Sequence, residues 1–159
     1  GMLAAIDYWF DSFVKKTLTN IVMNLIPVSR KFEKNENSIS FDDTVVLCKK
    51  FMEYNQRNIV IFPEGSRGTS DAIMPFRKGA ARFAHALKKP IVPIYINGSS
   101  KSWPKGKIFM KPCRITINIL EPIKSSDYIS DNKDEFSLSD IIASDLEKRI
   151  TDERNRTKI

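Results

Sequence analysis

The segment from residue 58 to residue 96 restricts the possible folds most strongly. Two short apolar runs, 58–62 and 91–96, enclose a helical pattern over 76–87 that ends before a proline. Apolar runs of this length, bounded by proline or glycine, are typical of buried strands. A strand, a helix and a second strand in succession are typical of a parallel βαβ unit. We therefore predict an α/β fold in which a mixed, mostly parallel sheet is flanked by helices.

The remaining periodic segments predict further helices and strands around this unit. Ser40 is the predicted N-cap of the second helix, with Asp42 and Asp43 in its first turn, where the helix dipole favours acids. The predicted elements are one long helix or two short ones over 3–26, a helix over 41–54, hairpin strands over 107–110 and 114–120, and a helix over about 137–154.

Composition limits the class of protein. The 159 residues, 42% of them hydrophobic and 28% charged, suit one globular domain, which we place at 2–159. The formal charge of +7 favours anionic partners such as phosphates, nucleic acid or an acidic membrane surface. The two cysteines, Cys48 and Cys113, lie far apart without a neighbouring histidine, so we predict neither a disulfide nor a metal site. No apolar stretch reaches the roughly 18 residues that a transmembrane helix needs.

The loop "PEGSRG", 63–68, directly follows the predicted strand 58–62. Open α/β sheets bind ligands in the crevice beyond the carboxyl ends of their strands. Gly65 permits a tight turn and close approach of a ligand, and Arg67 offers a planar donor fork for a phosphate or a carboxylate. Glu64 is placed to hold that fork or to accept a hydroxyl. We interpret the loop as an anion-binding device; the alternative is a surface turn with one ion pair.

Four strings follow one another in the sequence: "IPVSRKF", "IFPEGSRG", "FRKGAARFA" and "IVPIYI". They resemble the second block, the third block, the segment after it and the fourth block of the glycerolipid acyltransferase superfamily, whose best-known members are lysophosphatidic acid acyltransferases. The resemblance covers about residues 3–122, and blocks two to four lie within 26–96. It implies a glycerolipid acyltransferase fold that is truncated at its N-terminus.

The resemblance also implies a substrate-binding site. In the family the second and third blocks hold the phosphate of the acyl acceptor, which would be a phosphorylated lysolipid. The acyl donor would be acyl-CoA or an acyl-carrier protein, with no other cofactor and no metal. The implied residues are Arg30 and Arg67 for the phosphate, Glu64, Gly65 and Ser66 for the shape of the pocket, and Lys78 as a basic neighbour assigned on geometry.

The family's first block, a His followed four residues later by an Asp, supplies the general base, and it is missing here. The sole histidine, His85, comes after the third block, and the residue four places on is Lys89. We interpret His85 as a helix-face residue, assign no catalytic residue and expect little or no turnover from this chain. Either the chain is a truncated acyltransferase or it is a natural non-catalytic relative.

Three functions follow from these patterns. The first is an acyltransferase domain of phospholipid synthesis, cytoplasmic and peripherally associated with the inner face of the membrane. The second is a module that binds anionic lipid without chemistry. The third, nucleic-acid binding, is disfavoured because the basic residues are scattered. The apolar 3–26 segment packs in the core or lies on the membrane surface. Loss of the first block would expose a sheet edge or an apolar patch, so we also expect self-association.

Overall fold

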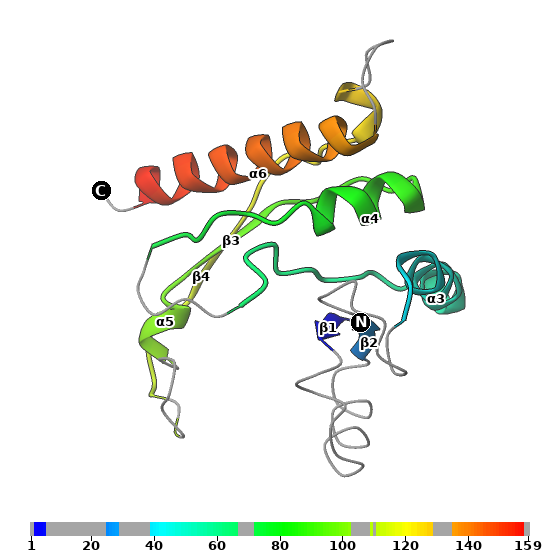
Figure 1. The fold of residues 1–159 in the computed structure, drawn as a ribbon. Coiled ribbons are helices and arrows are strands. Elements are labelled where there is room, and N and C mark those ends of the chain that lie inside the picture. The colour runs from blue at the N-terminus through cyan, green and yellow to red at the C-terminus, as the bar shows by residue number, and fades with distance from the viewer. Residues whose placement is uncertain are drawn as a thin grey trace. The chain divides into compact units, whose positions relative to one another are not determined.

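The structure is a computed structural model. It divides into two compact units, residues 1–62 and 63–159, which are described in turn (Figure 1). The residues that it describes are 2–5, 25–28, 39–66, 72–102, 109, 111–128 and 135–157.

Parallel strand pairing organises the first unit. Strand β1 (Met2–Ala5) pairs in parallel with β2 (Leu25–Val28). On its other side β1 meets the predicted strand 58–62 at one residue, Val60, which bridges to Met2 in parallel. The Leu3 N–H donates to the Val60 carbonyl oxygen at 3.2 Å. Strand β1 therefore lies between β2 and Val60.

The predicted helix over 3–26 is wrong at both ends, since residues 2–5 and 25–28 are strands. Residues 6–24 lie outside the described residues. A short apolar run is compatible with a strand as well as with a helix turn, and periodicity alone does not separate them. Here the choice depends on hydrogen bonds between segments that are more than twenty residues apart, which a local pattern does not contain.

Helix α3 (Phe41–Glu53) confirms the predicted helix over 41–54, and a 3₁₀ turn, η1 (Tyr54–Gln56), follows it. Ser40 is its N-cap: the Asp43 N–H donates to the Ser40 hydroxyl oxygen at 3.0 Å. The helix packs against β2. Its buried side chains are Thr44, Val45 and Cys48.

The second unit contains one antiparallel ribbon and two main helices. Strands β3 and β4 pair antiparallel, with Ile94 opposite Ile119, and a bridge between Ile91 and Ile123 extends the pairing. The elements are α4 (Gly79–Leu87), β3 (Ile94–Asn97), α5 (Ser99–Ser102), β4 (Thr116–Ile119), η2 (Ser125–Tyr128) and α6 (Glu135–Thr157).

In this unit the observed elements differ from three of the predicted ones in their bounds. The predicted 137–154 helix is confirmed and is longer at both ends. The predicted 76–87 helix begins three residues later, at Gly79. Strand β4 lies within the predicted strand 114–120 and pairs with β3, a non-local pairing that turn signals cannot reveal, whereas its predicted hairpin with 107–110 is not tested. Of the predicted strand 107–110, Phe109 lies in a bend and the rest lies outside the described residues.

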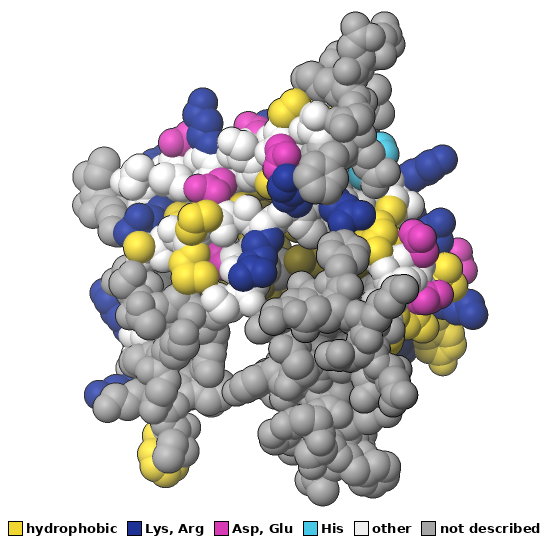
Figure 2. All heavy atoms as spheres, in the orientation of Figure 1, with side chains coloured by type: hydrophobic (Ala, Val, Ile, Leu, Met, Phe, Trp, Pro, Cys, Tyr) yellow, Lys and Arg dark blue, Asp and Glu magenta, His cyan; other side chains and the backbone are white. Residues whose placement is uncertain are grey.

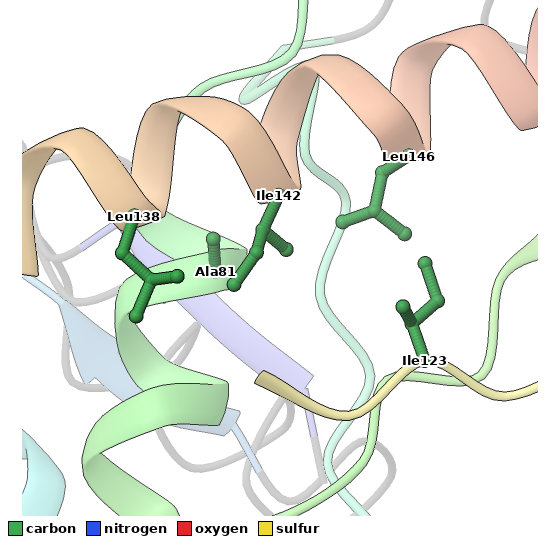
Figure 3. Packing of buried hydrophobic residues seen from close by; sticks show 5 residues of the cluster. All are labelled: Ala81, Ile123, Leu138, Ile142 and Leu146. Atoms are coloured by element: carbon green, nitrogen blue, oxygen red, sulfur yellow. The ribbon is translucent and has the colours of Figure 1, made fainter. Parts of the chain in front are cut away.

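The core of the second unit lies under α6. Figure 3 shows three side chains of α6 pointing toward Ala81 of α4 and toward Ile123, which follows β4. Partly buried Phe76, Ile91 and Tyr128 pack around this cluster. The three α6 residues are Leu138, Ile142 and Leu146, of which Ile142 is only 1% exposed. Their spacing is the apolar stripe that the sequence predicts for this helix.

The two faces of the β3–β4 ribbon differ. On one face Asn118 donates its Nδ2 hydrogen to Glu153 Oε1 of α6 at 2.8 Å, so α6 lies along this face (Figure 1). Side chains alternate along a strand, and the other face therefore carries the neighbouring residues. These are Ile94, Ile96, Ile117 and Ile119, which are 39% to 70% exposed. We call these four residues the isoleucine face.

Helices combined with parallel and antiparallel strand pairs confirm the predicted α/β class. The predicted strands 58–62 and 91–96 belong to different units, so the parallel βαβ unit that would join them stays a prediction. No helix in the described ranges is long and apolar enough to cross a membrane.

Candidate functional site

The predicted site residues divide into two groups. Arg30 and Arg67 lie outside the described residues. The other four lie in the second unit, three of them in the turn that begins at Pro63 and one directly before α4. These four are Glu64, Gly65, Ser66 and Lys78. The described part of the site is therefore the turn and the stretch that leads back from it into α4.

Glu64 ties the turn to that returning stretch. Its Oε2 accepts a hydrogen bond from the Met74 N–H at 2.9 Å, across ten residues of sequence. A carboxylate that accepts a backbone N–H forms a charge-assisted bond, which is stronger than a neutral one. Glu64 therefore fixes the loop's geometry through the backbone, a role that sequence reasoning did not assign to it.

Gly65 leaves space for the side chain of Arg77. It adopts φ +70°, which glycine tolerates better than other residues. A Cβ atom added there would lie 2.8 Å from Arg77 Nε and 2.9 Å from Arg77 Cδ. The Arg77 N–H also donates to the Pro63 carbonyl oxygen at 2.9 Å. Arg77 thus lies against the turn through both its backbone and its side chain.

Lys78 forms an ion pair with α6. Its Nζ lies 2.8 Å from Asp140 Oδ2, and the two side chains are 40% and 51% exposed. An exposed pair of this kind contributes roughly 0–1 kcal/mol to stability. The predicted substrate role of Lys78 stays a prediction.

A second carboxylate holds the stretch in front of α4. Glu147 Oε2 on α6 accepts the Phe76 N–H at 2.8 Å, and these residues are 71 positions apart in the sequence. Glu64 and Glu147 together anchor Met74 and Phe76, and thereby the backbone that carries Arg77. Sequence reasoning missed Arg77 and Glu147. The "FRKG" string contains two basic residues, Arg77 and Lys78, and sequence reasoning chose Lys78. No local sequence pattern indicates a role for Glu147.

Three other candidates within the described residues are His85, a metal site and a hollow beside α6. His85 lies on α4 and is partly buried, in agreement with its interpretation as a helix residue. No three His, Cys, Asp or Glu side chains of the described residues are grouped as a metal site would require. A hollow of about 430 Å³ beside Phe76 is lined mainly by polar side chains of α6 and includes neither Glu64 nor Arg77. Its lining does not fit an acyl chain, so we place the site at the turn.

The surface charge is mixed. Figure 2 shows Lys and Arg side chains of the described residues interspersed with acidic ones over this side of the molecule. Nucleic-acid-binding proteins typically gather their basic residues into a patch or stripe. The visible distribution therefore gives no support to the nucleic-acid hypothesis.

Comparisons with known proteins bear on both the family and the fold. The sequence model of a family described as Acyltransferase matches residues 2–97, which is more than half of the chain. The 1-acyl-sn-glycerol-3-phosphate acyltransferase of Saccharomyces cerevisiae is 41% identical over 98 residues. The proteins of the same name from Cocos nucifera and Limnanthes douglasii are 35% and 34% identical over 99 and 79 residues.

These matches cover part of each relative. They include 60%, 62% and 50% of this chain but only 32%, 32% and 28% of the yeast, coconut and Limnanthes proteins. The chain therefore spans about a third of the length of the curated relatives that it matches. All three matched proteins carry the same name.

A solved structure supports the fold. The crystal structure of the 1-acyl-sn-glycerophosphate (LPA) acyltransferase PlsC from Thermotoga maritima aligns with 93% of this chain and 56% of its own, with a TM-score of 0.59. The two sequences are 16% identical in this alignment, so the likeness concerns the fold alone. It confirms the fold that the sequence blocks imply.

Proposed function

Because the chain belongs to the acyltransferase family, we propose that it is the acceptor-binding part of an enzyme that acylates a phosphorylated lysolipid in phospholipid synthesis. The observation that carries this proposal is the third-block turn. Glu64 fixes the turn through Met74, and a basic side chain, Arg77, lies against it. A basic residue at a fixed turn suits an anionic ligand such as the phosphate of lysophosphatidic acid.

The roles within the site follow the blocks. Arg30 and Arg67 bind the acceptor phosphate, and Lys78 assists from the start of α4. Glu64, Gly65 and Ser66 shape the turn. In the reaction the acceptor hydroxyl attacks the thioester carbon of acyl-CoA or of an acyl-carrier protein. A general base takes the hydroxyl proton as the new C–O bond forms, the C–S bond then breaks, and the proton passes to the leaving thiolate, which departs as the thiol.

The general base is the part that residues 1–159 do not provide. No histidine in the sequence is followed four residues later by an aspartate. Loss of a general base typically lowers the rate by about 10²- to 10⁴-fold. We therefore expect residues 1–159 alone to bind the acceptor without measurable acyl transfer. A module that binds anionic lipid without chemistry is the second candidate, and the same observation favours it.

The setting that fits this function is the cytoplasmic face of a membrane, with the protein attached peripherally, because the acceptor is a lipid. The formal charge of +7 supports attraction to an acidic lipid surface. Self-association is a further part of the proposal, supported by the exposed isoleucine face.

A binding titration tests the proposal. Phosphatidylcholine vesicles that contain lysophosphatidic acid are compared with matched vesicles that contain lysophosphatidylcholine, using the wild type, Arg30→Ala and Arg67→Ala. We expect preferential binding to the vesicles with lysophosphatidic acid, whose head group is a free phosphomonoester, and we expect both substitutions to weaken it. Equal binding to the two vesicle types would contradict the function. The same samples, assayed with acyl-CoA, should show no turnover; turnover that Arg67→Ala abolishes would overturn the assignment of inactivity.

A further inference from the structure

The geometry points to Arg77 as a further residue that binds the phosphate of the acyl acceptor, an inference that rests on the proposed function. The sequence blocks assign this role to Arg30 and Arg67, and sequence reasoning chose Lys78 as the basic neighbour. The structure places the adjacent residue, Arg77, against the turn instead.

Two contacts locate Arg77 there. Its N–H donates to the carbonyl oxygen of Pro63, the first residue of the turn, at 2.9 Å. Its Nε and Cδ occupy the space that a Cβ atom at position 65 would enter, at 2.8 and 2.9 Å. Gly65 precedes Arg67 by two residues. The Arg77 side chain therefore lies beside Gly65, within the sequence block that also contains Arg67.

Arg77 lies at an exposed position. Among the described residues, no carboxylate forms an ion pair with its guanidinium. The nearby acids have other partners: Glu64 accepts the Met74 N–H, and Glu147 accepts the Phe76 N–H. Lys78, by contrast, is paired with Asp140.

The arginine fork suits a phosphate in particular. A guanidinium presents five N–H donors in a fixed plane, and two of them can engage two phosphate oxygens at once. Lysine carries the same charge but acts as a point donor. Replacement of Arg77 by lysine therefore separates a role in phosphate binding from a role that needs charge alone.

The experiment measures phosphate-dependent affinity in solution and on vesicles. The probes are sn-glycerol 3-phosphate, which has no acyl chain, and the lysophosphatidic acid and lysophosphatidylcholine vesicles described above. The variants are Arg77→Ala, Arg77→Lys and Arg67→Ala. Lys89→Ala, which removes an exposed cation beyond the end of α4, is the matched control. The Nε–H resonance of Arg77 is identified by its absence from the Arg77→Lys spectrum and followed during the titration.

We expect Arg77→Ala to weaken binding of both phosphate probes by about tenfold or more, since a hydrogen bond to a charged group is lost. Arg77→Lys should fall between that variant and the wild type, Lys89→Ala should bind as the wild type does, and the Arg77 Nε–H resonance should shift with sn-glycerol 3-phosphate. A role in packing alone would leave that resonance unmoved.

The outcomes separate this inference from the proposed function. If Arg67→Ala loses binding while Arg77→Ala binds as the wild type does, the role of Arg77 is wrong and the proposed function stands. If the wild type does not prefer the phosphate probes, the proposed function fails and the role of Arg77 fails with it. A loss in Arg77→Ala that is equal on lysophosphatidylcholine vesicles would also overturn the inference, because Arg77 would then not recognise the free phosphomonoester that distinguishes lysophosphatidic acid from the choline phosphodiester.

Discussion

Glycine at three positions shows how one residue type serves different local needs. Gly65 and Gly98 adopt positive φ angles of +70° and +91°. At Gly65 a Cβ atom would meet the flexible side chain of Arg77, which can move aside. At Gly98 it would meet the backbone carbonyl oxygen of Arg114, two residues before β4, at 2.3 Å. Gly79, in the first turn of α4, has nothing within 4 Å of an added Cβ.

We predict that Gly98→Ala lowers the free energy of unfolding by about 2 to 4 kcal/mol, because it adds both backbone strain and overlap with a backbone carbonyl. The control, Gly79→Ala, should raise the same quantity by up to about 1 kcal/mol, since alanine is the better helix former. Urea denaturation followed by circular dichroism measures both. Equal stability of the two variants would show that the ribbon yields at Gly98.

At the scale of elements, a hydrogen bond from Tyr128 to Asp145 joins η2 to α6. Asp145 accepts from the Tyr128 hydroxyl and from Arg149 Nε, the latter at 2.7 Å. Burial raises the pKa of Asp145, but the hydrogen bonds from Tyr128 and Arg149 outweigh it and bring this pKa below its ordinary value of 3.8. Burial and the bond to Asp145 raise the pKa of Tyr128. The connection before α6 is therefore held by an ionised aspartate.

This arrangement predicts a pH-dependent contribution to stability. The folded state binds the Asp145 proton less tightly than the unfolded state does, so the contribution is present above about pH 4 and is lost as pH falls through the lowered pKa. Asp145→Asn should cost about 1 to 3 kcal/mol at neutral pH, and the difference from the wild type should shrink in acid. Asp140→Asn on the same helix, which breaks only an exposed pair, should cost less than about 1 kcal/mol. A loss for Asp145→Asn that persists unchanged below pH 3 would argue against the ionised aspartate as its cause.

At the scale of the whole molecule, the isoleucine face is the feature most suited to contact with a second copy. Its four residues form the cross-strand pairs Ile94 with Ile119 and Ile96 with Ile117, so the face is continuous and uncharged. An apolar face can pair with the same face of another copy about a two-fold axis, because it is complementary to itself. Exposed apolar patches on soluble proteins commonly mark such contacts.

We predict that the double variant Ile117→Thr, Ile119→Thr reduces self-association. Threonine keeps the β-branched shape that suits a strand while it lowers the apolar area. The matched control, Val46→Thr with Leu47→Thr, alters two exposed apolar residues of α3 that are 49% and 41% exposed. Sedimentation velocity over a range of concentrations gives the result. Association that both double variants weaken equally would mean that the isoleucine face has no special part in it.

The sequence by itself determined the features that depend on neighbouring residues. The period and the N-cap of α3, the apolar stripe of α6 and the family blocks are all contained in short stretches, and each is confirmed by the structure or by the family match. The tertiary structure decided what depends on residues that lie far apart. It paired β1 with β2 where a helix was predicted, gave β4 the partner β3, and brought Glu147 to the backbone of Phe76. Through these anchors it set Arg77 against Gly65. Hydrogen bonds and packing between distant segments leave no local period in the sequence, and for this reason the sequence did not indicate that Arg77 lies beside Gly65.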